Sequence, residues 1–345
     1  MSERPEGDGG GTTTLTKKDF TSDQEVRWCP GCGDYAILAT MQSFLPELGI
    51  PPHRIVFVSG IGCSGRFTYY VDTYGVHGIH GRAPALATGI AAARPDLSVW
   101  VITGDGDGLS IGGNHLIHAL RRNVNLKILL FNNQIYGLTK GQYSPTSEEG
   151  KVTKSTPFGS LDHPFNPVAL ALGAEATFVA RTLDNDRQHL TGVLRAAAGH
   201  RGAAFIEIYQ NCNVFNDGAF DVIREKESGR RNQIRLEDGK PILFDEGRRA
   251  VVAGPNGRLE VVPSDSVPAD RVVVHDVRGD PSLAFALAHL AAGPTQPTPI
   301  GVFRQVERPV YGEAMEAQIA QATERLGKGD LAKLLRSGDV WEVKG

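Results

Sequence analysis

Two segments near the middle of the chain have the pattern of neighbouring strands in a parallel sheet. Residues 99–103 (VWVIT) lead into Gly104-Asp105-Gly106, and residues 126–131 (LKILLF) lead into Asn132-Asn133. Between them, residues 114–122 carry apolar side chains at the spacing of a helix that packs on a sheet. A strand–helix–strand crossover of this kind brings both loops to one sheet edge, where doubly wound folds bind ligands. The pattern therefore predicts both a fold class and the place of a ligand site.

The polar residues at these two strand ends suit a hard metal ion. A carboxylate from Asp105 and a carboxamide from the Asn132-Asn133 pair can meet at one cation that also holds a diphosphate, because such ions prefer oxygen ligands. Asn132, the first residue of the pair, need not be a ligand. A bare Gly-Asp-Gly is a common turn, so Asp105 could also be a plain turn or helix-capping aspartate. The paired asparagines at this distance favour the metal site.

Composition and patterning place the chain among α/β proteins. Strand and helix patterns alternate through residue 212, which predicts a doubly wound, mostly parallel sheet covered on both faces. The formal net charge of −3 gives no electrostatic case for nucleic acid or for an anionic membrane surface. No apolar run is long enough to span a membrane. The absence of an export signal and the small number of cysteines indicate the cytoplasm.

The chain is predicted to have three parts. Residues 1–15 are polar and rich in glycine and threonine, which indicates a disordered tail. Residues 16–225 form the ligand-binding domain. Residues 226–345 form a C-terminal extension that packs on the core or on a partner, and its first part, through residue 239, has the charge crowding of a solvated connector. Within the main domain, the long polar stretch 137–164 predicts a loop that binds something or covers a site.

The four cysteines are predicted to form one site. Cys63 and Cys212 follow strand patterns, so they should end at the same sheet edge, and Cys29-x-x-Cys32 supplies two more thiols. Four thiolates suit a structural zinc ion or a 4Fe–4S cluster. One Cys-x-x-Cys pair with two isolated cysteines favours the cluster, because all-cysteine zinc sites usually consist of two such pairs. A thioredoxin-like redox pair would leave Cys63 and Cys212 unexplained.

Six ordered motifs resemble those of the β subunits of 2-oxoacid:ferredoxin oxidoreductases, and most of all the 2-oxoglutarate branch. The motifs are WCPGCG (28–33), SGIGCSG (59–65), HGRA (80–83), GDGD (104–107), NNQIYGLTKGQ (132–142) and YQNCN (209–213). The similarity is dense from about residue 25 to 220 and returns weakly at residues 299–304. It implies thiamine diphosphate, Mg²⁺ and one 4Fe–4S cluster as cofactors.

The resemblance also implies roles for individual residues. The cluster ligands are Cys29, Cys32, Cys63 and Cys212, and the Mg²⁺ ligands are Asp105, Asn133 and the carbonyl of Ile135. The residues that line the thiamine cofactor are Ile61, Gly62, Cys63, Ser64, His80, Arg82, Gly104, Asp105, Gly106, Asp107, Asn133, Ile135, Gly137 and Leu138. Two have other interpretations: His80 as a buried structural histidine, and Arg82 as the partner of a core carboxylate.

Arg66 is the candidate for substrate recognition. A guanidinium can hold the carboxylate of a 2-oxoacid in bidentate geometry, and the resembling family has a basic residue here. The alternative is a solvated surface arginine. The implied reaction is oxidative decarboxylation of 2-oxoglutarate with coenzyme A, which gives succinyl-CoA and CO₂ and delivers electrons to ferredoxin.

Thiamine enzymes also need a glutamate beside the cofactor, usually from a second homologous domain that this chain lacks. The resemblance therefore implies an α subunit in an α2β2 assembly, without which the chain is inactive. Pyruvate and branched-chain 2-oxoacid enzymes share the motifs and are alternatives. A non-oxidative thiamine decarboxylase or synthase subunit would not explain four ordered cysteines, and a zinc-stabilised interaction module would not explain Asp105 and Asn133.

Overall fold

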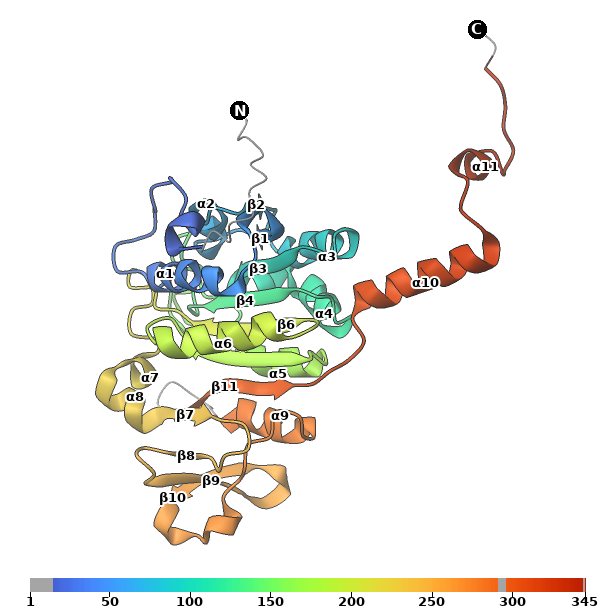
Figure 1. The fold of residues 1–345 in the computed structure, drawn as a ribbon. Coiled ribbons are helices and arrows are strands. Elements are labelled where there is room, and N and C mark those ends of the chain that lie inside the picture. The colour runs from blue at the N-terminus through green and yellow to red at the C-terminus, as the bar shows by residue number, and fades with distance from the viewer. Residues whose placement is uncertain (1–14, 291–295, 344) are drawn as a thin grey trace.

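One twisted eight-stranded sheet organises the chain (Figure 1). The computed structural model describes residues 15–290, 296–343 and 345, so the predicted disordered tail falls almost wholly outside the described residues. The strand order is β2-β1-β3-β4-β6-β5-β11-β7. The strands are β1 (Ile55–Ser59), β2 (Tyr74–His77), β3 (Ser98–Gly104), β4 (Lys127–Asn132), β5 (Phe178–Leu183), β6 (Ala204–Tyr209), β7 (Gln233–Leu236) and β11 (Thr298–Gln305). All neighbouring pairs are parallel except β5 and β11, which confirms the predicted mostly parallel α/β sheet.

Helices cover both faces of the sheet, as the alternating pattern predicted (Figure 1). Their bounds are α1 (Asp34–Phe44), α2 (Phe67–Tyr70), α3 (Ala83–Ala93), α4 (Gly113–Arg121), α5 (Pro167–Gly173), α6 (Arg187–Gly199), α7 (Asp221–Arg224), α8 (Lys226–Asn232) and α9 (Pro281–Leu290). The apolar side chains of α1 and α6 pack in one cluster, and those of α3, α4, α5 and α9 pack in another. Strand residues alternate between them: Phe57 joins the first and Val58 the second. Strands buried on both faces carry continuous apolar runs, which is why β1 and β4 are recognisable in the sequence.

Two strands of the C-terminal third, β7 and β11, belong to this sheet, so the sheet continues past the predicted boundary near residue 225. The predicted solvated connector forms α8 and then β7, which adds to the sheet edge beside β11. A separate three-stranded antiparallel sheet follows, with β8 (Leu243–Phe244), β9 (Arg249–Ala253) and β10 (Leu259–Pro263). The charged residues of 225–239 obscured α8 and β7 in the sequence, because both elements are short and only partly buried.

The last two helices extend away from the body (Figure 1). These are α10 (Tyr311–Leu326) and α11 (Leu331–Leu335), and every residue from Leu331 to Val343 is exposed. Their large exposed apolar side chains include Ile319, Leu326, Leu335 and Trp341. Across the part of the chain that the structure describes, no helix combines the length and apolar character needed to cross a membrane.

The sheet topology gathers the sequence motifs at one edge. Strands β1, β3, β4 and β6 are adjacent and parallel. The residues that follow them therefore emerge side by side: the Cys63 loop, Asp105, Asn133 and the Cys212 loop. This is the carboxyl edge of the strands, where open α/β sheets bind ligands.

Candidate active site

Free thiols from three separate segments lie close together at this edge. A Cβ added to Gly137 would lie 3.5 Å from the Sγ of Cys63 and 3.7 Å from the Sγ of Cys212. Cys29 and Cys32 face the same region from a tight turn, in which the Cys32 amide donates to the Cys29 carbonyl at 3.0 Å. All four cysteines are unpaired thiols. The convergence of Cys63 and Cys212 agrees with the expectation from the strand order.

Burial holds the Cys32 and Cys63 thiols in their protonated form. Burial raises the pKa of Cys63 to about 12, and Asp34, Cys212 and Cys29 add to the shift. Burial, followed by Asp34, also raises the pKa of Cys32. Thiols in such a setting lose their protons only when positive charge replaces them, as iron or zinc does. Among the described residues, no group of three or more His, Cys, Asp or Glu side chains is arranged to hold a single metal ion. Four thiols drawn from three segments are the donor set that a 4Fe–4S cluster takes.

Asp34 is a buried carboxyl beside this group that the sequence did not reveal. It begins α1, only 2% of its surface is exposed, and its Oδ1 has no hydrogen-bond partner. Burial raises its pKa to about 7; a hydrogen bond from Cys32 opposes the rise and Asp184 adds to it. The sequence signal was weak because an aspartate in the first turn of a helix is ordinary.

Asp105 is held by the long polar loop. It is buried, and its Oδ2 accepts hydrogen bonds from the hydroxyls of Ser144 at 2.5 Å and Thr146 at 2.6 Å. Burial raises the pKa of Asp105 to about 6, and these two hydroxyls partly offset the rise. Both hydroxyls donate to the same oxygen, and the backbone N–H groups of Gly106 and of Asp105 itself also lower the pKa of this carboxyl. The loop predicted to bind or cover a site covers this carboxylate.

The two asparagines each turn the chain locally. The Oδ1 of Asn132 accepts from the Gln134 amide, and the Oδ1 of Asn133 accepts from the Ile135 amide. These successive turns hold Gln134 in the left-handed region, at φ 55°. Asn132 also donates to Glu207 at 2.7 Å and accepts from Thr146 at 2.8 Å. Asn132 is therefore fully engaged inside the protein, in line with its omission from the predicted ligands.

The oxygen atoms at this turn fit Mg²⁺. The Asp105 carboxylate, the Asn133 amide oxygen and the Ile135 carbonyl come from two adjacent strand ends. No hydrogen bond to the Ile135 carbonyl occurs within the described ranges. A carboxylate, an amide oxygen and a backbone carbonyl are the hard ligands that such a cation takes alongside phosphate oxygens.

Asp107 joins the phosphate-side loops together. Its Oδ1 accepts from the amides of Ile61 at 3.1 Å and Gly81 at 2.7 Å and also contacts Nδ1 of His80. Its Oδ2 accepts from the Thr103 hydroxyl at 2.6 Å. Both oxygens of Asp107 are thus occupied by the protein, so it shapes the loops rather than facing a ligand directly.

The histidine and arginine of the HGRA motif have different surroundings. His80 is ordered by Asp107, and its side chain is 38% exposed, unlike a fully buried structural histidine. Arg82 donates to the Ile111 carbonyl at 3.0 Å, and it forms no ion pair within the described ranges. The expected alternative for Arg82, pairing with a core carboxylate, is thus absent from this part of the chain.

Two of the predicted glycines, Gly104 and Gly106, lie where a side chain would come close to neighbouring residues. A Cβ on Gly106 would lie 2.1 Å from the ring of Tyr136, whose hydroxyl donates to the Gly106 carbonyl. A Cβ on Gly104 would lie 3.3 Å from the Oγ of Ser64, which puts the Cys63 loop against the Asp105 turn. Gly62 has φ 129°, a conformation that favours glycine. Leu138 is 44% exposed at the outer side of the turn.

Arg66 lies in a short 3-10 turn, Ser64–Arg66, directly after Cys63. Its side chain is half-buried, and its guanidinium forms no ion pair or hydrogen bond within the described part of the chain. Its charge acts on Cys63, where it lowers the pKa and so opposes the effect of burial. A half-buried guanidinium without an internal partner is consistent with the predicted role in holding an anion.

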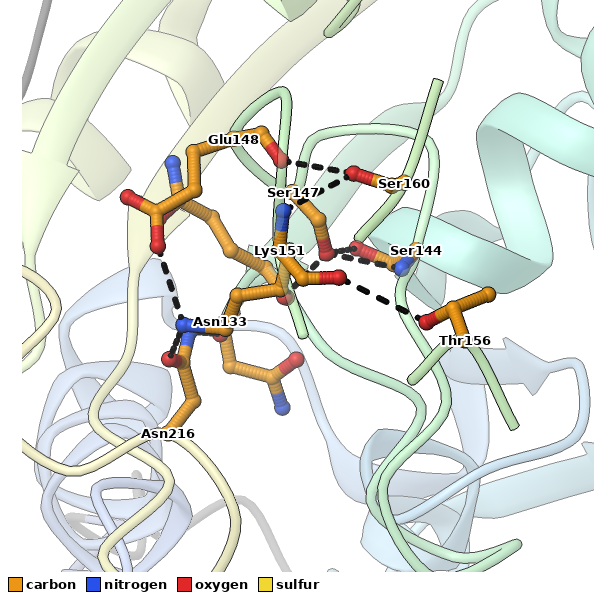
Figure 2. A network of polar contacts seen from close by, with 9 residues as sticks. Asn133, Ser144, Ser147, Glu148, Lys151, Thr156, Ser160 and Asn216 are labelled. Atoms are coloured by element: carbon orange, nitrogen blue, oxygen red, sulfur yellow. Dashed lines mark hydrogen bonds and ion pairs between the residues drawn. The ribbon is translucent and has the colours of Figure 1, made fainter. Parts of the chain in front are cut away.

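A polar network joins the long loop to the Asn133 turn (Figure 2). Asn216 donates to the Asn133 carbonyl at 2.9 Å and accepts from Lys151 at 2.7 Å. Lys151 also pairs with Glu148 at 3.2 Å. The backbone amide of Asn216 donates to the Cys212 carbonyl, so one asparagine contacts the Asn133 turn, the loop and the cysteine segment.

A large cavity lies next to this arrangement but not within it. Its volume is about 740 Å³, and its lining includes Asn132 and Thr146 together with the buried pair Arg181 and Glu207. None of the cysteines, His80 or Arg82 lines it. Asn132 and Thr146, which hydrogen-bond to each other, connect the cavity to the Asp105 turn.

Comparisons with known proteins show which sequences and structures the chain resembles. The model of the C-terminal, thiamine-pyrophosphate-binding domain of thiamine pyrophosphate enzymes matches residues 60–208. The chain is 61% identical over 329 residues to 2-oxoglutarate oxidoreductase subunit KorB of Mycobacterium tuberculosis, which covers 94% of this chain and 88% of that protein. It is 38% identical to 2-oxoglutarate synthase subunit KorB of Methanocaldococcus jannaschii over 66% of this chain and 85% of that protein.

One solved structure extends the likeness to nearly the full length. It is the 2-oxoglutarate:ferredoxin oxidoreductase from Magnetococcus marinus with 2-oxoglutarate, coenzyme A and succinyl-CoA bound. The TM-score is 0.74 at 34% sequence identity, and the alignment covers 95% of this chain and 97% of that chain.

Proposed function

The chain belongs to the family of 2-oxoacid:ferredoxin oxidoreductase β subunits, and from that premise we propose which of its residues hold each cofactor and the substrate. It is the β subunit of a 2-oxoglutarate:ferredoxin oxidoreductase, as its likeness to KorB subunits and to the Magnetococcus marinus enzyme supports. The overall reaction converts 2-oxoglutarate and coenzyme A to succinyl-CoA and CO₂, with two electrons passed to ferredoxin. The α subunit supplies the other half of the site.

The proposed cofactor site uses the residues around the Asp105 turn. Asp105, Asn133 and the Ile135 carbonyl hold Mg²⁺, and Ser144 and Thr146 orient the Asp105 carboxylate for it. The Ile61–Ser64 loop and His80, both anchored on Asp107, border the diphosphate. Thiamine diphosphate, when bound, supplies the carbanion chemistry that removes CO₂ from a 2-oxoacid.

The proposed electron acceptor uses the four cysteines. Cys29, Cys32, Cys63 and Cys212 hold one 4Fe–4S cluster, which when bound accepts electrons one at a time. Trp28 covers the Cys63 segment, where its indole N–H donates to the Cys63 carbonyl at 2.7 Å. Arg66, three residues after Cys63, holds a substrate carboxylate.

One observation carries the proposal: a Cβ added to Gly137 would lie 3.5 Å from the Cys63 sulfur and 3.7 Å from the Cys212 sulfur, and Gly137 comes only two residues after Ile135. The proposed Mg²⁺ turn and the proposed cluster are therefore neighbours on one short segment. A thiamine decarboxylase that performs no oxidation has no need of thiols at that position. The arrangement supports an oxidative reaction, in which an electron acceptor must lie beside the thiamine.

The test is to co-express the chain with its α partner and purify the complex without oxygen. We expect a brown protein with four iron and four sulfide per chain, and 2-oxoglutarate-dependent dye reduction that requires coenzyme A. Pyruvate and branched-chain 2-oxoacids are compared in the same assay. A colourless complex that holds one zinc per chain would overturn the proposal.

Single substitutions distinguish the proposed Mg²⁺ and thiamine site from the proposed cluster site. Cys212→Ser should remove the visible absorption of the cluster but leave thiamine diphosphate binding, and Asp105→Ala should do the reverse. Asp96→Asn is a matched control for the loss of a carboxylate, because Asp96 is surface-exposed and, among the described residues, pairs only with Arg94. Loss of both cofactors in every variant, the control included, would indicate misfolding rather than these roles.

A further inference from the structure

Gln210 contacts one of the proposed cluster ligands through its side chain. It is the residue that follows β6, and its Nε2 lies 3.2 Å from the Sγ of Cys32. Among the side-chain hydrogen bonds of the described residues it is the one that reaches a cysteine sulfur, and the backbone N–H of Asp34 also acts on the Cys32 thiol. Gln210 is 1% exposed, so water does not compete for its amide.

The surrounding bonds determine which way the amide points. The Nε2 of Gln210 also donates to the carbonyl of Asn211 at 2.6 Å. That carbonyl accepts from Gly33 of the cysteine turn at 3.1 Å as well. Rotating the amide by half a turn would set the Gln210 oxygen against the Asn211 carbonyl, with two acceptors in contact. One amide hydrogen therefore goes to Asn211, and the other is directed at Cys32.

The backbone of Gln210 is equally restrained. Its amide donates to the Asn132 carbonyl at 2.9 Å, at the end of β4. Its side-chain Oε1 is buried and has no hydrogen-bond partner. A buried polar atom without a partner costs free energy, so an apolar side chain would remove that cost. The presence of glutamine here calls for a compensating role of its N–H groups.

We propose that Gln210 is a positioning residue that tunes the reduction potential of the cluster through its hydrogen bond to Cys32. The inference rests on the proposed function, because it requires the cysteines to hold the cluster. Hydrogen bonds to cluster sulfurs are among the features that determine the potential. Reduction adds one negative charge that spreads onto the cysteine sulfurs. An N–H group directed at Cys32 stabilises this more negative state, so it raises the potential.

The test is a redox titration of the complete enzyme, purified with its α partner without oxygen, in which electron paramagnetic resonance reports the reduced cluster. Gln210→Leu removes the donor, and the midpoint should move to a more negative value. At a fixed applied potential, the ratio of reduced to oxidised cluster should fall several-fold. Gln210→Glu places a negative charge beside Cys32, so its midpoint should move further in the same direction.

Gln42→Leu is the matched control. Gln42 is a buried glutamine on α1, and its amide donates at 2.8 Å to the Tyr70 carbonyl and not to a sulfur. Its loss should leave the midpoint unchanged. Iron and sulfide are assayed in every variant, so that a change in potential is distinguished from a loss of cluster.

The outcomes separate this inference from its premise. An unchanged midpoint in Gln210→Leu, with the cluster intact, would overturn the inference alone. Loss of the cluster from both Gln210 variants but not from Gln42→Leu would also overturn it, because Gln210 would then hold the cysteine turn. A wild-type enzyme without any cluster would overturn the proposed function together with the inference.

Discussion

The buried ion pair behind the Asp105 turn offers a quantitative test of how the site is supported. Glu207 on β6 and Arg181 on β5 lie 2.7 Å apart, and their side chains are 0% and 2% exposed. Burial opposes the charge on Arg181, but Glu207 outweighs this and leaves the pKa of Arg181 raised. The other oxygen of Glu207 accepts from Asn132. Removing the charge of Glu207 should therefore destabilise both the sheet and the turn.

The perturbation is Glu207→Gln, which keeps the shape and leaves an acceptor for Asn132. Arg181 would remain buried without a counter-charge, which costs about 3–5 kcal/mol. A urea slope of about 3 kcal/mol per molar then gives a drop of about 1–2 M in the unfolding midpoint. The assay is urea unfolding of the isolated, cofactor-free chain, followed by circular dichroism.

A double-mutant cycle identifies the source of the loss. Arg181→Met keeps apolar packing on the rings of Tyr209 and Phe303, over which the guanidinium lies at 5.2 and 5.4 Å. Combining it with Glu207→Gln removes both charges, so the double variant should be more stable than Glu207→Gln alone. Asp96→Asn, which breaks an exposed pair, should leave the midpoint unchanged. A cost below about 1 kcal/mol for Glu207→Gln would refute the reasoning.

Four further outcomes are expected. Burial raises the pKa of Asp105 to about 6, so Mg²⁺ binding in the presence of thiamine diphosphate should weaken by up to about tenfold per pH unit below pH 6. A Mg²⁺ affinity that calorimetry finds constant from pH 5 to 8 would contradict this. Thr146→Val removes a hydroxyl from that carboxylate, and the Mg²⁺ Kd should rise about tenfold or more, with an unchanged circular dichroism spectrum as the check on folding. Arg66→Ala should raise the Kd for 2-oxoglutarate more than that for thiamine diphosphate, with Arg66→Lys intermediate; equal, small effects would reject the role. Burial raises the pKa of Asp34 in the folded chain to about 7, above its ordinary 3.8, so between these pH values the folded chain binds more protons than the unfolded chain. The unfolding free energy of the cluster-free chain should therefore fall as pH rises from 4 to 7, by at most about 1.4 kcal/mol per pH unit. Asp34→Asn should flatten this pH dependence.

The sequence predicted those parts of the site that depend on strand ends. Parallel strands with continuous apolar runs are easy to recognise, and their carboxyl ends must meet at one edge. This is why the order of residues along the chain was enough to place Cys63, Asp105, Asn133 and Cys212 together. The cover over Asp105 was foreseen only as a long polar loop, because nothing in 137–164 indicates which hydroxyl reaches which carboxylate.

What the sequence could not predict is the burial of single polar groups. Asp34, Glu207 and Gln210 each look ordinary in the chain, and their roles come from partners far away in sequence. The C-terminal third was obscured for a related reason. Residues 233–236 form a strand only because β11 is available beside them, and short strands carry too little periodicity to be recognised alone.

The antiparallel strand β11 has a consequence for how the chain is made. Until residues 298–305 leave the ribosome, β5 has no neighbour on its outer side and presents unpaired N–H and C=O groups. Arg181 in that strand also lacks, until then, the Phe303 ring over which its guanidinium lies and the Pro299 carbonyl to which it donates. The nascent protein thus has an unpaired, aggregation-prone sheet edge from the completion of β5 at residue 183 until β11 has been made. A fragment that stops at residue 225 should keep that edge permanently and aggregate, although it contains every proposed ligand.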